Sequence, residues 1–519
     1  NITADGDSFN TAVGYQAGTA VTTGVQNVLI GGEAGDALTD ADFNVAMGVS
    51  ALGSDTLGSR NVAIGHGSLS THNVSSAANT YNTAVGFHAG VAVTTGTQNT
   101  LIGGLSGDAI TTASNNTAVG FASLGANTIG TQNSSFGAFS LDANTTASNN
   151  TAFGYASLTA NTTGATNTAV GANALDANTT ASSSVAVGHN AATANTTGAN
   201  NVAVGKDSLE TNTTGAGNTA IGKDALQANT TASNNTAVGL DALTANTTGT
   251  ANTSLGSLSA KTMTTASSNT AIGFAALELT TTGANNTAVG SAALRANTEG
   301  TQNTAVGLQA LNANTTGIQN VAVGAESAEA NTTGNYNVAI GYRSLEATTT
   351  GSQNVAIGRS AMESNTTASN NTAVGFAALE VNTTGHSNTA VGKSALVANT
   401  TAVNNTAVGM EALLATTTGG TNTAIGVASL TANTTGSQNT ALGVSALGAN
   451  TTATNNTAVG KSALSVNTTG NNNVAMGTGA LDANTTAANN TGLGTQTLSA
   501  NTTGTANTAV GFAALEAST

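Results

Sequence analysis

The feature that most constrains this chain is a five-residue sequence: Asn, then Thr or Val, then Ala, an aliphatic residue and Gly. It reads NVAIG at Asn61–Gly65 and NTAIG at Asn218–Gly222. The copies begin at residues 10, 27, 44 and 61, and then at 82 and every seventeen residues as far as Asn507. A fixed period of this length predicts a repeat architecture, in which each unit packs mainly against its neighbours in sequence.

The composition narrows the choice among repeat folds. Aromatic residues make up 3% of the chain and charged residues 6%, and there is no Pro, Trp or Cys. A globular core needs large side chains to bury apolar area at about 25 cal/mol per Å², and this chain has few of them. Small residues at a strict period favour a narrow solenoid instead. The lack of cysteine excludes a disulfide framework and cysteine-ligated metal clusters.

The unit Asn286–Gln302 (NTAVGSAALRANTEGTQ) illustrates one coil, with its residues numbered as positions 1 to 17. Positions 2 to 4 favour a strand, and the glycine at position 5 ends it. The segments between glycines are too short for helices. We therefore expect an all-β fold, a β-solenoid or parallel β-roll of about thirty 17-residue coils. With two short strands per coil and coils about 4.8 Å apart, it forms an elongated rod.

The regularity of the repeat divides the chain. Residues 1–9 are a lead-in segment, residues 10–115 form less regular coils with a loop insertion near 66–81, and residues 116–519 form a regular array. No linker or change of composition indicates a further domain. Because the chain opens without Met, we expect it to be a piece of a longer protein.

Comparison of the copies predicts which positions face solvent. Charged side chains concentrate at positions 6, 7 and 10, so we expect these positions to form an exposed ridge. Its candidate residues are Lys206, Asp207, Glu210, Lys223, Asp224, Arg359 and Glu363. Positions 4 and 9 are apolar in nearly every coil and are predicted to form the core. The core residues named on this basis are Ile64, Val238, Val289 and Leu294.

Position 3 is alanine in nearly every coil and never carries a charge. In a strand it points away from positions 2 and 4, so one of these two sets must leave the coil interior. We expect position 3 to leave it and to be covered by further copies of the chain, since a bare apolar face invites aggregation. The simplest source of that cover is a second copy of the chain. The predicted interface residues are Ala63, Ala84, Ala220, Ala288 and Ala305.

The pentad with its trailing Ala-Asn-Thr-Thr-Gly segment resembles the SVAIG-type head repeats of YadA-like trimeric autotransporter adhesins, over the span 10–519. The resemblance implies short coils in a left-handed parallel β-roll, with three chains packed along a common axis. On this basis the predicted assembly is a homotrimer, intertwined or side by side. The seventeen-residue period is longer than that of the adhesins. The finer pattern, such as LIGG followed by Gly-Asp-Ala at Leu29–Ala37, is more similar to virion fibre proteins of marine phages, cyanophages especially.

The sequence gives little support for a catalytic, metal-binding or nucleic-acid-binding site. The five histidines (His66, His72, His88, His189 and His386) lie in different coils, without a recurring acid or nucleophile. Asp36, Asp40 and Asp42 carry oxygen ligands suited to calcium, but the EF-hand spacing is absent, which favours a solvated acidic loop. The net charge of −15 and the nine basic residues exclude a basic stripe for nucleic acid. We expect neither catalysis nor a bound metal or cofactor.

Two polar features of the repeat remain. Thr-Thr pairs at positions 13 and 14 would stack into threonine rows like those of ice-binding solenoids, although neighbouring strand residues point to opposite sides. Asn-Thr-Thr and Asn-Asn-Thr also match the glycosylation sequon. The asparagine at position 1 is predicted to form a ladder, bonding from coil to coil and satisfying backbone groups in the turns.

The sequence thus predicts an extracellular structural fibre of a phage virion, a tail or other appendage fibre that mediates attachment to a host or surface. Three identical ridges would add weak contacts to an unidentified surface receptor, such as a glycan, as avidity. No membrane insertion is expected within this segment. A trimeric adhesin on a bacterial cell surface is the first alternative. A monomeric ice-binding or matrix solenoid is the alternative from another class.

Overall fold

A computed structural model describes residues 8–517, and in this range the regular structure consists of strands without a helix. Two compact units divide the chain, unit 1 (Asn1–Ser257) and unit 2 (Leu258–Thr519). The lead-in predicted for residues 1–9 falls mostly outside the described residues. Both units are built from the same coil, so the predicted all-β solenoid with tandem 17-residue coils is confirmed.

In unit 1 the strands of the main sheet are β1 (Thr11–Val13), β2 (Val28–Ile30), β3 (Val45–Met47), β5 (Val62–Ile64), β7 (Thr83–Val85), β8 (Thr100–Ile102), β9 (Thr117–Val119), β10 (Ser134–Phe136), β11 (Thr151–Phe153), β12 (Thr168–Val170), β13 (Val185–Val187), β14 (Val202–Val204), β15 (Thr219–Ile221), β16 (Thr236–Val238) and β17 (Thr253–Leu255). A separate pair joins β4 (Gly58–Ser59) to β6 (Ala78–Asn79).

In unit 2 the strands are β18 (Thr270–Ile272), β19 (Thr287–Val289), β20 (Thr304–Val306), β21 (Val321–Val323), β22 (Val338–Ile340), β23 (Val355–Ile357), β24 (Thr372–Val374), β25 (Thr389–Val391), β26 (Thr406–Val408), β27 (Thr423–Ile425), β28 (Thr440–Leu442), β29 (Thr457–Val459), β30 (Val474–Met476), β31 (Thr491–Leu493) and β32 (Thr508–Val510).

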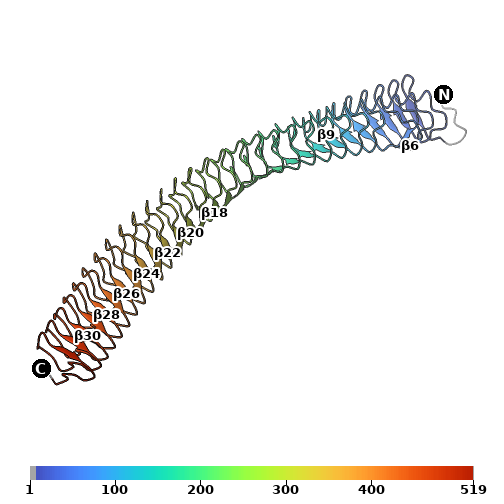
Figure 1. Ribbon diagram of the computed structural model, residues 1–519. Helices are drawn as coiled ribbons and strands as arrows, with labels where there is room; N and C mark the ends of the chain where they lie inside the picture. The colour runs from blue at the N-terminus through green and yellow to red at the C-terminus, as the bar shows by residue number, and fades with distance from the viewer. Residues whose placement is uncertain (1–7, 518–519) are drawn as a thin grey trace. The chain divides into compact units, whose positions relative to one another are not determined.

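Within each unit every strand pairs in parallel with the strand of the next coil, in register (Figure 1). In unit 2, for example, Ala288 lies beside Ala305 and Val289 beside Val306. In unit 1, Ala203 lies beside Ala220 in the same way. Each coil position therefore generates a row of equivalent side chains along its unit. The residue types in each row determine the chemistry of that part of the surface.

Each coil contains one three-residue strand, and the predicted second strand around position 9 is a turn. Ala292 and Leu294, at positions 7 and 9, have φ angles of 56° and 52°, which extended strands do not allow. The turn is nevertheless bonded to its neighbour: the backbone N–H of Leu294 donates to the carbonyl of Ala310 at 2.9 Å. The glycines at position 9 of several irregular coils, such as Gly18 and Gly35, are the sequence signal for this left-handed conformation.

The glycine at position 5 turns the chain directly after the strand. Gly290 has a φ of 137°, and a β-carbon there would lie 2.4 Å from the carbonyl oxygen of Gly307 in the next coil. Any side chain would therefore break the stacking as well as strain the backbone. This requirement explains why glycine ends all thirty copies of the pentad.

The interior of the coil is lined by position 3, and the strand is inverted relative to the prediction. Ala288 and Leu294 are fully buried within a single chain, whereas Val289 is partly exposed on the outer face. The assignment of Leu294 to the core is confirmed. The assignment of the outward residues Ile64, Val238 and Val289 to the core is wrong. So is the assignment of the inward residues Ala63, Ala84, Ala220, Ala288 and Ala305 to an assembly interface.

The narrowness of the coil is the physical reason for this inversion. At Gly492, which occupies position 3, a β-carbon would lie 3.5 Å from Cγ of Leu481, a position-9 leucine. An alanine methyl group therefore already fills the space opposite leucine. Where position 3 carries the larger Leu29, position 9 of the same coil is Gly35, and a β-carbon on that glycine would lie 2.8 Å from the Leu29 side chain. The two positions share one interior volume.

Asparagine at position 1 forms the predicted ladder. Asn303 Nδ2 donates to the carbonyl oxygen of Gly317 at 2.8 Å, and its Oδ1 accepts the backbone N–H of Asn320 in the next coil at 2.9 Å. A second, unpredicted ladder runs at position 12, where Asn314 Nδ2 donates to Asn297 Oδ1 at 3.0 Å. These buried amides satisfy turn backbone groups that otherwise lack partners, and the ladder prediction is confirmed.

The coil after Asn61 contains the loop insertion, inside the predicted 66–81 range. Gly58 pairs with Ala78, Ser59 pairs with Asn79, and Asn73 still bonds in regular register to Thr94. Three of the four extra residues therefore lie between Asn73 and Ala78, and the fourth lies between Asn79 and Asn82. The guanidinium group of Arg60 lies over the rings of Phe43 and Tyr81, 4.7 and 5.9 Å from their centroids. These cation–π interactions link Tyr81, at the end of the inserted coil, to Arg60 and Phe43 of the two preceding coils, and stabilise the outer surface there.

Candidate binding surfaces

The predicted ridge consists of positions that differ in exposure. Lys206, Lys223 and Arg359, at position 6, are exposed. Glu210, Asp224 and Glu363 are half-buried, and Asp207 is buried, with 7% of its surface exposed. Position 6 therefore forms the outer edge of the ridge, while the named residues of positions 7 and 10 are half-buried or buried.

In unit 1 the cations of the ridge are neutralised within their own coils. Lys206 pairs with Asp207, and Lys223 Nζ lies 2.6 Å from Asp224 Oδ2. The hydrogen bond from Lys206, opposed by burial and aided by Asn190, lowers the pKa of Asp207 below its usual value. These pairs leave little net charge on this part of the surface.

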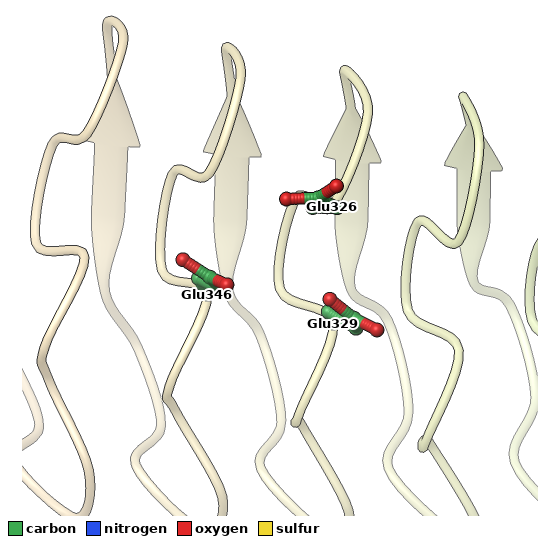
Figure 2. A group of neighbouring side chains, drawn as sticks. All are labelled: Glu326, Glu329 and Glu346. Atoms are coloured by element: carbon green, nitrogen blue, oxygen red, sulfur yellow. The ribbon is translucent and has the colours of Figure 1, made fainter.

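Unit 2 gathers an acidic cluster at positions 7 and 10, drawn in Figure 2. Single carboxylate oxygens of Glu326, Glu329 and Glu346 lie within 4.8 Å of one another. Arg343 contacts the cluster, with Nε 2.7 Å from Glu326 and 3.7 Å from Glu346. Burial and, to a smaller extent, the neighbouring glutamates raise the pKa of Glu346, against the effect of Arg343. The guanidinium accounts for the clustering, and its own pKa is raised by the same carboxylates.

The candidate calcium ligands of the sequence are not brought together. Asp40 Oδ1 accepts a hydrogen bond from Thr23 at 2.6 Å, and Asp42 Oδ1 accepts the backbone N–H of Val25 at 2.7 Å. Asp36 lies at position 10, with a pKa raised mainly by burial. Among the described residues, the acidic group whose oxygens converge is the glutamate cluster of unit 2.

The histidines occupy three kinds of place. His66 and His88 are stacked with Phe87 on the surface, and His189 and His386 are exposed. His72 is fully buried at position 12, where its Nδ1 lies 2.8 Å from Asp55 Oδ2. The amide Nδ2 of Asn82 donates to His72 Nε2 at 3.2 Å, so Nδ1 carries the proton that is donated to Asp55. This pair occupies the interior column of position 12 between the buried apolar residues Leu38 and Val93, and it faces no solvent.

The threonine rows differ in their availability. At position 13 the hydroxyl of Thr298 donates to the carbonyl of Thr315 at 3.2 Å, and this bond recurs from coil to coil. Position 14 is exposed, with Thr316 as an example. A two-row array of free threonine hydroxyls is therefore absent from this turn in the described coils.

The outer face of the sheet carries the most uniform surface of the chain. All thirty residues at position 4 are Val, Ile, Leu, Met or Phe. Many are substantially exposed, such as Ile221 at 39%, Ile340 at 38% and Leu442 at 46%. Position 2, on the same face, is Thr or Val in nearly every coil. This surface, the position-4 face, was predicted to be core because its residues are apolar in every coil.

The rows at positions 6 and 10 separate the charged and aromatic residues. Position 6 holds five of the nine Lys and Arg, eight of the fifteen Phe and Tyr, and none of the 24 Asp and Glu. Position 10 holds twelve of those 24 acids and two bases. The coil thus carries an acidic edge and, separately, an edge of aromatic and basic side chains.

Comparison with known proteins adds no relative. No protein-family model matches the chain, and no curated protein is similar to it. Among the described residues, no helix is long and apolar enough to cross a membrane. The fold and its rows define the class as a tandem-repeat β-solenoid with an apolar outer sheet face.

Proposed function

We propose that this chain is a structural fibre segment that associates with further copies of itself, as a homotrimer, and serves attachment to a host or surface. The observation that carries the proposal is the position-4 face, an exposed aliphatic row repeated once per coil. A surface of this kind is stabilised by a partner that buries it. A partner whose own side chains repeat at the coil spacing matches it along its length, and a second copy of this chain has that spacing.

The virion fibre is the first assignment, and a bacterial surface adhesin is the alternative with the same assembly. Both use the repeat mechanically, presenting identical rows on each chain so that weak contacts add as avidity. The resemblance of the pentad to adhesin head repeats and to marine phage fibre proteins supports an extracellular place for either one. The monomeric ice-binding or matrix solenoid is less well supported, because the position-13 hydroxyls are bonded to backbone carbonyls.

The test is the mass of the chain in solution and its dependence on the position-4 face. Sedimentation of the full chain is expected to give three times the monomer mass of 49.8 kDa. The double variant Val289→Asp and Val306→Asp places carboxylates on the outer face and is expected to weaken association while the coils remain folded. The matched control, Ser291→Asp with Ala325→Asp, changes two exposed or half-exposed position-6 residues and leaves the mass unchanged. A wild-type chain that sediments as a monomer at micromolar concentration overturns the proposal.

A further inference from the structure

The position-6 row of unit 2 alternates in chemical character from coil to coil. From residue 342 to residue 461, in steps of seventeen, it reads Tyr342, Arg359, Phe376, Lys393, Met410, Val427, Val444 and Lys461. Large apolar side chains occupy every second coil, and cations occupy the coils between them except at Val427. Continuing toward the N-terminal side, Leu308 and Phe274 maintain the same two-coil spacing.

These side chains form a continuous exposed row. Each position-6 carbonyl accepts the backbone N–H of position 7 in the next coil, as Tyr342 does from Ser360 at 2.9 Å and Arg359 does from Ala377 at 3.1 Å. Tyr342, Phe376 and Met410 are 41, 46 and 43% exposed. The guanidinium of Arg359 lies 5.8 Å from the ring centroid of Phe376, which links neighbouring members of the row.

The cations of this row are placed differently from those of unit 1. Lys206 and Lys223 are each followed by an aspartate that pairs with them. Arg359, Lys393 and Lys461 are each followed by serine, and among the described residues no carboxylate lies within ion-pairing distance of them. A chain with a net charge of −15 therefore keeps three cations uncompensated on one edge.

We propose that this row, from Tyr342 to Lys461, binds an extended anionic polysaccharide that carries about one negative charge per disaccharide. Two coils span about 10 Å, close to the length of two sugars in an extended β-linked chain. Three of the four such lengths offer one flat or aliphatic side chain, which packs against the C–H face of a sugar ring, and one cation for an acidic group. The fourth, Met410 with Val427, offers two apolar side chains. This inference deepens the attachment role and rests on it for its biological meaning, although the row is present in a single chain.

Charge density selects this ligand over a nucleic acid. Duplex DNA carries a negative charge about every 1.7 Å, and its binding proteins need correspondingly dense cations. Here the cations of the row are at least two coils apart, and position 10 adds acids in the first three coils of the row, Glu346, Glu363 and Glu380. A sparsely charged glycan matches this cation spacing, whereas a nucleic acid would leave most of its phosphates without a cation.

The experiment measures binding of the full chain to three immobilised polymers: hyaluronan, with one carboxylate per disaccharide, neutral dextran and duplex DNA. Hyaluronan is expected to bind, with affinity that falls as salt rises. The triple variant Tyr342→Ser, Arg359→Ser and Phe376→Ser is expected to lose at least tenfold in affinity. The control Tyr336→Ser removes a tyrosine that is 50% exposed at position 17 and is expected to bind as the wild type does.

The outcomes separate this inference from the fibre proposal. Unchanged binding by the triple variant, failure of hyaluronan to bind, or equal binding of dextran or DNA overturns the polysaccharide site. The sedimentation mass of the same samples reports on association independently. A trimer that ignores hyaluronan leaves the fibre proposal in place, and a monomer that binds hyaluronan removes the fibre proposal alone.

Discussion

The inner and outer faces of the same three-residue strand obey different rules. In β19, Ala288 points inward and is fully buried, while Thr287 and Val289 point outward and are partly exposed. Both faces look conserved from coil to coil, but for different reasons. The inner face is restricted by volume, since alanine and leucine share one narrow interior. The outer face is restricted by polarity, since it admits Val, Ile, Leu, Met and Phe of quite different sizes.

That difference teaches how to recognise an interior row. A row that tolerates several sizes but no polar residue faces a surface that can adjust. A row whose large residues occur where the facing row is small lies in a closed space. Leu29 beside Gly18 and Gly35, and Leu101 beside Gly90 and Gly107, are two such exchanges at positions 3 and 9. The comparison therefore makes separate predictions for each face.

The largest effect is expected from a charge on the inner face. Ala288→Asp places a carboxylate in a closed apolar space without a partner, which costs several kcal/mol. Because every coil supports its neighbours, we expect unit 2 of this variant to unfold well below the temperature of the wild-type thermal transition. Circular dichroism during heating measures this loss. Val289→Asp, one residue further along, is expected to leave the transition of the coils nearly unchanged, and equal damage by both variants would contradict the difference between the faces.

The shared interior volume predicts a compensating set of substitutions. Ala288→Leu alone overfills the coil, and Leu294→Gly alone leaves a cavity, so we expect each to destabilise unit 2 by about 2–4 kcal/mol. Leu29 lies between two position-9 glycines, Gly18 of the preceding coil and Gly35 of its own. The triple variant Ala288→Leu, Leu277→Gly and Leu294→Gly reproduces this natural combination and is expected to recover most of that loss. Denaturant unfolding of the wild type, the single variants and the triple variant gives the interaction energy between the sites. Additive losses in the triple variant would show that positions 3 and 9 do not share one space.

Much of this architecture follows from the sequence. The seventeen-residue period predicts the stacked coils, Gly290 and its equivalents mark the end of each strand, and the asparagine of position 1 predicts its ladder. These features depend on one residue and its copy in the next coil, and a repeat displays such pairs directly. The position-12 ladder is visible in the same way at Asn297 and Asn314, but it was not predicted, since Val, Leu, Ile, Thr, Met, Asp or His replace Asn in ten coils.

The alternation of side chains along the strand does not by itself predict which face of the strand points into the coil. Alternation shows that Ala288 and Val289 point to opposite sides, and the choice between the sides depends on the width of the coil. That width is set by the left-handed turns at positions 7 and 9. The residues around position 9 were predicted to form a second strand, so these turns and the width they set were not predicted. The charged rows were predictable as exposed, but the burial of Asp207 depends on its contact with Lys206 and Asn190.

The inner ladder is expected to contribute less than the apolar interior, but more than any outer polar residue. Asn303→Ala removes the donor to Gly317 and leaves the backbone N–H of Asn320 without its acceptor. Each unsatisfied buried group costs about 1–3 kcal/mol. Hydrogen exchange is expected to show faster exchange of the Asn320 amide and its neighbours. Asn312→Ala, at half-buried position 10, is the control and is expected to leave those amides protected.

The smallest effect is expected on the outer acidic row, and its sign depends on pH. Burial, with a smaller contribution from Asp108, raises the pKa of Asp142 above its unfolded value. A raised carboxyl pKa stabilises the fold below the unfolded pKa of about 3.9, and this contribution is lost as pH rises through the folded pKa. Asp142→Asn is therefore expected to raise the thermal midpoint slightly at pH 7, with the gain disappearing toward pH 3. Asp207→Asn should do the opposite, because Lys206 lowers the pKa of that group, and its loss of stability should fade as the pH falls through the lowered pKa. A pH-independent difference in both variants would mean that neither shift exists.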